Sequence, residues 1–198
     1  MQDEMSAKDL RERLGLIENM IAEGRRRTES WGWSFVLWGV AYYVAIGWST
    51  WGHSTWAWPV TMVAASVLTG ILASRVTHKG AETTIGRAMA AIWIAMGMSL
   101  FVVLFCLSLS GRADLHIFVA IVGGLLGAAN AISSMILKWK MQFACAVVWL
   151  ATAGVSCFIS ETQASVVFLV AIFFCQIVFG FYGMIGESRR RKQDAAHA

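Results

Sequence analysis

The sequence predicts an all-α polytopic membrane protein, with six transmembrane helices in three antiparallel hairpins and an amphipathic cytoplasmic helix at the N-terminus. Three observations predict this class: 58% of the 198 residues are hydrophobic, only 14% are charged, and the apolar residues gather in runs separated by polar breaks. A soluble domain has about 25% charged residues, so this chain is too apolar for water. Helices are the open-ended element that satisfies its own backbone hydrogen bonds in lipid.

Residues 1–30 form the first element, a cytoplasmic amphipathic helix followed by a basic juxtamembrane segment. Its apolar residues recur at alternating spacings of 3 and 4, which is the seam of a short coiled coil. The seam consists of Ala7, Leu10, Leu14, Ile17 and Ile21. Ser6 and Asp9 resemble a capping box, and we expect the helix to end near Gly24, before Arg25–Arg27.

The seam of this helix has three possible uses. It can lie in the membrane interface, pack against the same helix of a second copy, or bind a groove on a soluble partner. The residues that we expect to bind the partner or the second copy are Leu10, Leu14, Ile17 and Ile21.

Six apolar runs follow, and each is predicted to be one transmembrane helix. They hold about 17–23 residues without an internal charge, which suits a hydrocarbon core of about 30 Å. The runs are Ser34–Thr50, Trp58–Ser74, Met89–Ser110, Ile117–Leu137, Met141–Ser160 and Ala164–Gly186. They form a bundle over residues 31–186, with short links that include Glu161–Gln163, and residues 187–198 form a basic cytoplasmic tail.

The distribution of basic residues predicts the orientation. Fifteen of the 16 lysines and arginines lie in segments that six spans would place on one side, and only Arg112 lies on the other. The positive-inside rule therefore predicts that both termini are cytoplasmic. The basic residues lie beside membrane helices, so they indicate contact with lipid and not with nucleic acid.

Small residues indicate where helices pack closely. Gly123, Gly127 and Ala131 are spaced by four residues, as in the small-residue motif that lets two membrane helices approach. We expect this helix to be the packing centre. Gly180, Gly183 and Gly186 form a second such group near the inner end of the last run.

Few polar side chains lie near the middle of the predicted spans. Tyr42, Tyr43, Asn130 and Gln176 are the candidates, and Asn130 and Gln176 lie at similar depth. They can join helices, for example by an Asn130–Gln176 hydrogen bond. Alternatively, they can line a site for a ligand.

The sequence offers little for catalysis. No Asp, Glu, Lys, Arg or His lies within a run, and no nucleotide-binding, metal-binding or nucleophile motif occurs. His53, Asp114, His116 and Glu161 gather in the outer links without metal-ligand spacing. We therefore expect neither an enzyme nor a metal or other cofactor.

Two stretches carry a resemblance to a known group of proteins. One is Ile17-Glu18-Asn19-Met20-Ile21 with the arginines and Trp38-Gly39 that follow, and the other is Leu137-Lys138-Trp139-Lys140 after the small-residue run Gly123–Ser134. They resemble bacterial six-helix inner-membrane proteins of uncharacterised function with an amphipathic N-terminal helix, encoded near winged-helix regulators. The resemblance implies the bacterial inner membrane and a regulatory partner.

Two functional hypotheses follow. The first is a non-enzymatic membrane component, which acts as an anchor, sensor or assembly subunit and binds a protein partner or another copy through its N-terminal helix. The second is a small transporter or channel subunit for an uncharged or lipophilic solute, which uses Tyr42, Tyr43, Asn130 and Gln176.

Overall fold

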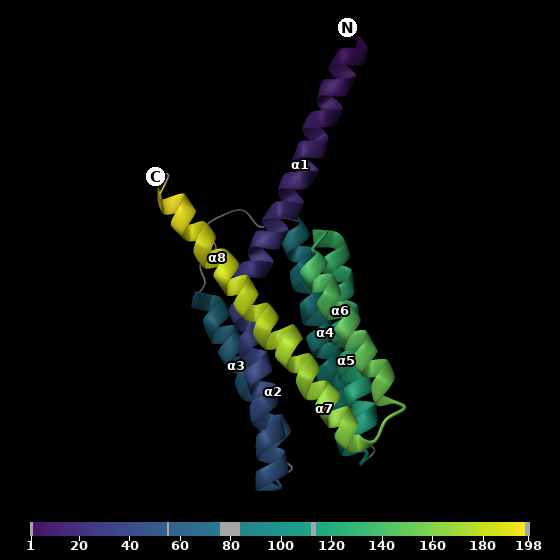
Figure 1. Ribbon diagram of the computed structural model, residues 1–198. Coiled ribbons are helices and arrows are strands. Elements are labelled where there is room, and N and C mark those ends of the chain that lie inside the picture. The colour runs from purple at the N-terminus through teal and green to yellow at the C-terminus, as the bar shows by residue number, and fades with distance from the viewer. Residues whose placement is uncertain (1, 55, 76–83, 112–113, 197–198) are drawn as a thin grey trace.

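The computed structural model describes residues 2–54, 56–75, 84–111 and 114–196, and these residues are helical apart from short links (Figure 1). The helices are α1 (Gln2–Ser30), α2 (Gly32–Gly52), α3 (Ala57–Arg75), α4 (Thr84–Leu109), α5 (Leu115–Leu137), α6 (Lys140–Ser156), α7 (Glu161–Ile172), the π-helical segment η1 (Phe173–Val178) and α8 (Phe179–Ala196). No strand occurs among them. The prediction of an all-α fold is confirmed.

Four helical segments are long and apolar enough to cross a membrane, as in a membrane protein. They are Ala57–Arg75, Thr84–Leu107, Leu115–Leu137 and Glu161–Arg190. The last of these joins α7, η1 and α8 into one continuous helix. Of the remaining two predicted spans, α6 has only 17 residues, and α2 is rich in tryptophan, tyrosine and glycine, which are less apolar than aliphatic residues. The total of six membrane-spanning helices therefore stays a prediction.

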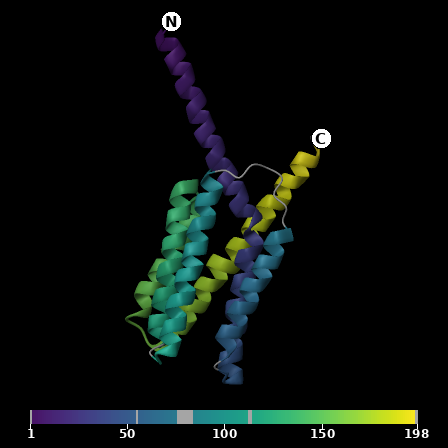
Figure 2. The same ribbon diagram turned by 180° about the vertical axis from the view of Figure 1, so that it is seen from behind.

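The helices form two packed groups joined by the long α7–α8 helix. Helices α4, α5 and α6 lie side by side, with the largest interface between α5 and α6. Helix α3 packs mainly on α2, and the ring of its Trp58 also contacts Phe118 of α5. The α7–α8 helix runs obliquely between the groups and contacts both (Figures 1 and 2). Both termini lie at the same end of the molecule.

Glycines allow the closest helix contacts. A Cβ added at Gly123 would lie 3.0 Å from the carbonyl oxygen of Trp149 in α6, and one at Gly127 would lie 2.7 Å from Cγ of Leu150. Ala131, one turn further on, is half-buried. At the crossing of α2 and α8, Gly32 and Gly180 bring the two backbones together in the same way. Close backbone approach of this kind is how membrane helices gain packing energy.

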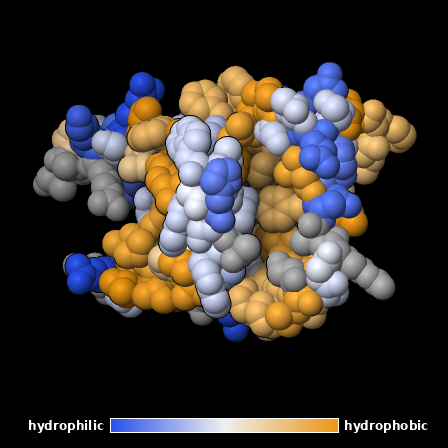
Figure 3. Space-filling model, turned by 90° about the horizontal axis from the view of Figure 1, so that it is seen from below, coloured by the Kyte–Doolittle hydropathy of each residue, from blue (hydrophilic) through white to orange (hydrophobic). Residues whose placement is uncertain are grey.

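The flanks of the bundle are apolar. Exposed valine, isoleucine, leucine and phenylalanine side chains occur along α2 to α8, and the view from below shows hydrophobic side chains around much of the perimeter (Figure 3). Apolar patches of this extent are rare on soluble monomers. They suit contact with lipid.

Three details of the sequence prediction are wrong, and a fourth feature, the helical state of the basic tail, was not predicted. Helix α1 begins at Gln2, so Ser6 lies inside it, and it continues through Gly24 to Ser30. The link after α6 comprises residues 157–160, and Glu161–Gln163 already belong to α7, because Ser160 caps that helix with Gln163 in a capping box. The basic tail is helical as far as Ala196.

Candidate functional site at the root of the N-terminal helix

Most of the predicted binding seam of α1 is exposed. The exposed fractions of Leu10, Leu14 and Ile17 are 60%, 53% and 52%, and this part of α1 projects beyond the other helices (Figures 1 and 2). The side chain of Ala7 lies outside the described residues. Ile21, the last seam residue, is half-buried and lines a cleft at the base of α1. The seam therefore has an outer part that faces solvent and an inner end that belongs to the bundle.

The inner third of α1 packs against α4, α5 and α8. Gly24 is buried where α1 passes α4 and α5, and a Cβ there would lie 2.6 Å from Ile85 and 2.9 Å from Leu137. This glycine serves close packing instead of ending the helix. Trp31 alone separates α1 from α2, so the position of α1 is tied to the bundle.

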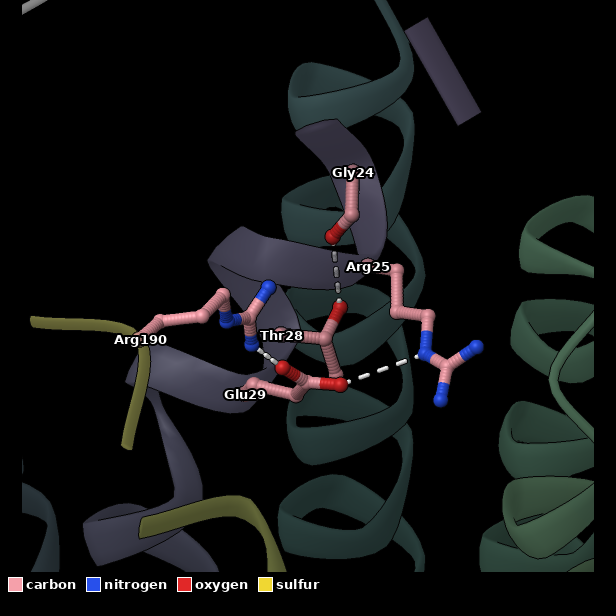
Figure 4. A network of polar contacts seen from close by, with 5 residues as sticks. All are labelled: Gly24, Arg25, Thr28, Glu29 and Arg190. Carbon is pink, nitrogen blue, oxygen red and sulfur yellow. Dashed lines mark hydrogen bonds and ion pairs between the residues drawn. The ribbon is translucent and has the colours of Figure 1, made fainter. Parts of the chain in front are cut away.

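A buried carboxylate joins α1 to α8. Glu29 is only 6% exposed and forms ion pairs with Arg25, at 3.2 Å from Nε to Oε1, and with Arg190 of α8 (Figure 4). Its backbone lies against Gly183, and Gly186 lies near its carboxylate. A buried charge is tolerated in a protein when it is paired in this way. Glu29 therefore holds the root of α1 on α8.

A cleft of about 590 Å³ opens beside this ion-pair network, between α1, the end of α5 and α8. Its charged lining consists of four cations and two carboxylates, namely Arg25, Arg26, Lys138, Arg190, Glu18 and Glu29. The formal charge of the lining is thus +2. Arg25 also lies over the ring of Trp139, 5.2 Å from its centroid, which fixes the guanidinium by a cation–π contact.

The two tyrosines of the predicted polar site serve packing of α2 on the α7–α8 helix. The hydroxyl of Tyr43 donates to the carbonyl oxygen of Leu169 at 2.8 Å, next to the start of η1. Tyr42 is buried and its ring contacts Trp38, Trp58 and Phe168. Both tyrosines thus lie at a helix interface.

The two amides of the predicted polar site do not bond to each other. Asn130 donates to the carbonyl oxygen of Leu126 in its own helix, and the side chain of Gln176 packs against Gly39 of α2. Both amides are buried, and the side-chain oxygen of each lacks a hydrogen-bond partner. The expected Asn130–Gln176 hydrogen bond is therefore absent.

The polar residues of the outer links have separate structural contacts. Asp114 caps α5 by accepting from the backbone N–H of Ile117, and His116 Nδ1 lies 2.8 Å from the carbonyl oxygen of Ser156. His53 follows α2 in the left-handed conformation, and Glu161 begins α7. Within the described part of the chain, no three His, Cys, Asp or Glu side chains are placed to hold a metal ion.

Sequence reasoning missed the role of Glu29, although a signal existed. Glu29 lies four residues after Arg25, a spacing that forms ion pairs on a helix. Because the sequence predicted that the helix ends near Gly24, this spacing was not applied to Arg25 and Glu29. The pairing with Arg190 spans most of the chain and leaves no local pattern. The cleft arises from that long-range contact, so it could not be found from sequence.

Within the described residues, the fold and the site together define an all-helical protein with four helices long and apolar enough to span a membrane, an exposed N-terminal helix and a basic cleft at the root of that helix. Comparisons with protein-family models, with curated proteins and with solved structures find no match.

Proposed function

We propose that this chain is a non-enzymatic component of the bacterial inner membrane, in which α1 binds a protein partner or another copy of the chain. The exposed outer seam carries this proposal, because three large aliphatic side chains on one face of a projecting helix are unfavourable in water. The bundle serves as the anchor, and the ion pairs of Glu29 fix the direction in which α1 leaves it.

The direction of α1 favours protein binding over a position in the membrane interface. The helix continues away from the end of the bundle instead of turning across it (Figures 1 and 2). A helix in the interface would lie in the plane of the membrane, roughly across the axes of the spanning helices. The seven acidic residues among the first 30 also disfavour a surface of anionic lipid.

We further infer that six helices cross the membrane, with α2 and α6 as the two additional spans and both termini in the cytoplasm. The termini lie at one end of the molecule, together with the cleft that Arg25, Lys138 and Arg190 line. The positive-inside rule assigns this end to the cytoplasm.

The test is the mass and composition of the native complex in mild detergent or lipid particles, for the full chain and for a variant without residues 1–28. We expect a defined oligomer, or a second protein, that the deletion removes. A full chain that is monomeric and alone would overturn the proposal.

Point substitutions sharpen this test. The pair Leu14→Ser and Ile17→Ser removes the seam, while Leu16→Ser changes a leucine that is equally exposed, at 59%, on another face of α1. We expect the seam pair to lose the complex and the Leu16 variant to keep it. Equal loss in both variants would mean that the seam does not specify the contact.

A second candidate, a transporter or channel subunit for an uncharged or lipophilic solute, is favoured by one observation. Several buried polar atoms lack partners, among them the side-chain oxygens of Asn130 and Gln176 and both amide atoms of Gln142. The oxygens can accept hydrogen bonds from a passing solute, and the Gln142 amide nitrogen can donate one. Solute flux that persists without residues 1–28 would favour this candidate over the first.

A further inference from the structure

The cleft at the root of α1 contains basic side chains that have no role in the proposed function. Of its four basic side chains, Arg26 and Lys138 are exposed and make no ion pair with any described residue. Arg190 and the Nε of Arg25 are bound to Glu29, so that carboxylate is already neutralised by two cations. The cleft thus keeps an excess of positive charge after its internal pairs are formed.

Arg25 is held in a geometry that suits an oxyanion. Its Nε is fixed by Glu29 and its guanidinium lies on the Trp139 ring, while its two terminal nitrogens point away from Glu29 (Figure 4). These nitrogens carry N–H donors in a planar fork, which matches two oxygens of a phosphate group. Lys138, which follows α5 in the left-handed conformation, adds a compact charge to the lining of the cleft.

The location of the cleft indicates where such a phosphate comes from. Ile21 and Leu137 give it an apolar lining beside the cations, and it lies at the end of α5, a helix apolar enough to cross a membrane. A lipid head group occupies this depth, whereas the acyl chains would extend along the apolar flanks of the bundle. Basic clefts between membrane helices at the cytoplasmic side suit anionic lipid head groups.

We propose that the cleft between α1, α5 and α8 binds a phosphate group, supplied by the head group of an anionic phospholipid. Arg25 binds two phosphate oxygens, and Arg26 and Lys138 provide further charge. Because Ile21, Arg25 and Arg26 belong to α1 and Lys138 ends α5, a bound head group joins the root of α1 to the bundle.

The test measures lipid binding to the delipidated full chain in neutral detergent by native mass spectrometry. Phosphatidylglycerol and phosphatidylcholine are titrated separately, and inorganic phosphate is added as a competitor at millimolar concentration. We expect phosphatidylglycerol to bind at least tenfold more tightly than phosphatidylcholine, with little effect of inorganic phosphate. Equal binding of both lipids would overturn the proposal. Displacement of phosphatidylglycerol by inorganic phosphate would show that the cleft binds free phosphate, and would overturn the assignment of the phosphate to a lipid head group.

Two double variants with the same change of charge locate the site. Arg26→Gln with Lys138→Gln removes two cations of the cleft, and Arg75→Gln with Lys140→Gln removes two exposed cations outside it. We expect the first pair to bind phosphatidylglycerol about 30-fold more weakly, since each basic residue near an anionic lipid contributes about fivefold. The second pair should change binding by less than about twofold. Equal weakening in both pairs would indicate diffuse attraction and overturn the site.

The result of the lipid-binding test is independent of the result of the test for complex formation. Lipid selectivity is measured on the isolated chain and requires no partner and no second copy. A failure of the lipid test leaves the complex formed by the outer seam unaffected, and a monomeric chain can still bind the lipid.

Discussion

Glu29 is the one charged side chain that is buried among the described residues, and its ion pair with Arg190 joins α1 to α8. Its carboxylate lies between Arg25 of its own helix and Arg190 of α8. The carboxylate is buried while both arginines are partly exposed, so removing its charge loses two charge-assisted contacts that water only partly replaces. The stability of this junction should therefore depend on the charge of Glu29.

We expect Glu29→Gln to lower the free energy of unfolding by about 2 kcal/mol, since hydrogen bonds to charged groups contribute about 1.5–3 kcal/mol. Thermal unfolding in detergent, followed by circular dichroism, measures the change. Glu18→Gln, an exposed position on the same helix, is the control and should change stability by less than about 0.5 kcal/mol. An unchanged melting temperature for Glu29→Gln would show that the pairs do not stabilise the junction.

The hydrogen bond of Tyr43 is a second contact of a single residue whose contribution to stability can be measured. Its hydroxyl bonds to the carbonyl oxygen of Leu169, so Tyr43→Phe should cost about 0.6–1 kcal/mol in a membrane helix interface. The matched control is Tyr182→Phe, because Tyr182 is 43% exposed, and it should be close to neutral. A neutral Tyr43→Phe in the same thermal assay would contradict the expectation.

At the scale of elements, close helix crossings depend on individual glycines. A Cβ added at Gly180 would lie 2.7 Å from the backbone oxygen of Gly32, so α2 and α8 would have to move apart. Gly124 of α5 has no atom within 4 Å of the added Cβ. The two glycines therefore differ in what an alanine would do, although both are helical.

We expect Gly180→Ala to destabilise the protein by about 1–3 kcal/mol through overpacking. Gly124→Ala should stabilise it by about 0.5–1 kcal/mol, because alanine loses less backbone entropy than glycine in a helix. Chemical unfolding in mixed micelles compares the two. The expectation fails if both substitutions shift stability in the same direction.

The sequence predicted most elements but not all of their ends. The apolar runs located the helices, because apolar length is a local property. The end of α1 was misplaced at Gly24, since glycine can end a helix or allow a close contact, and only the neighbours Ile85 and Leu137 decide between them. The capping box Ser160–Gln163 was a readable signal for the start of α7 that the apolar run obscured.

At the scale of the whole molecule, the sequence predicted that the chain belongs in a membrane, while the basic cleft depends on tertiary contacts. Arg25 belongs to α1, Lys138 directly follows α5 and Arg190 belongs to α8, and no local pattern records the mutual positions of these helices. The polar candidates Asn130 and Gln176 show the same difficulty, because equal depth in the membrane does not bring two side chains together.

The proposed six-span topology predicts which segments are accessible from outside the cell. In a chain with Cys106→Ser and Cys157→Ser, we expect Glu161→Cys to react with an impermeant maleimide in intact cells. Lys192→Cys should react only after the membrane is permeabilised. Labelling of both sites in intact cells, or of Lys192→Cys alone, would contradict the assigned orientation.

The junction between α1 and the bundle also has a mechanical consequence. The rigid helix between Gly24 and Leu10 is about 21 Å long, so α1 acts as a lever with its pivot where Gly24 packs against α4 and α5. A rotation of about 10° at that pivot moves Leu10 by about 4 Å. This is enough to break a side-chain contact, which requires heavy atoms within about 4–4.5 Å of each other. Small rearrangements of the charges around Glu29 are therefore magnified at the far end of α1, where the exposed leucines lie.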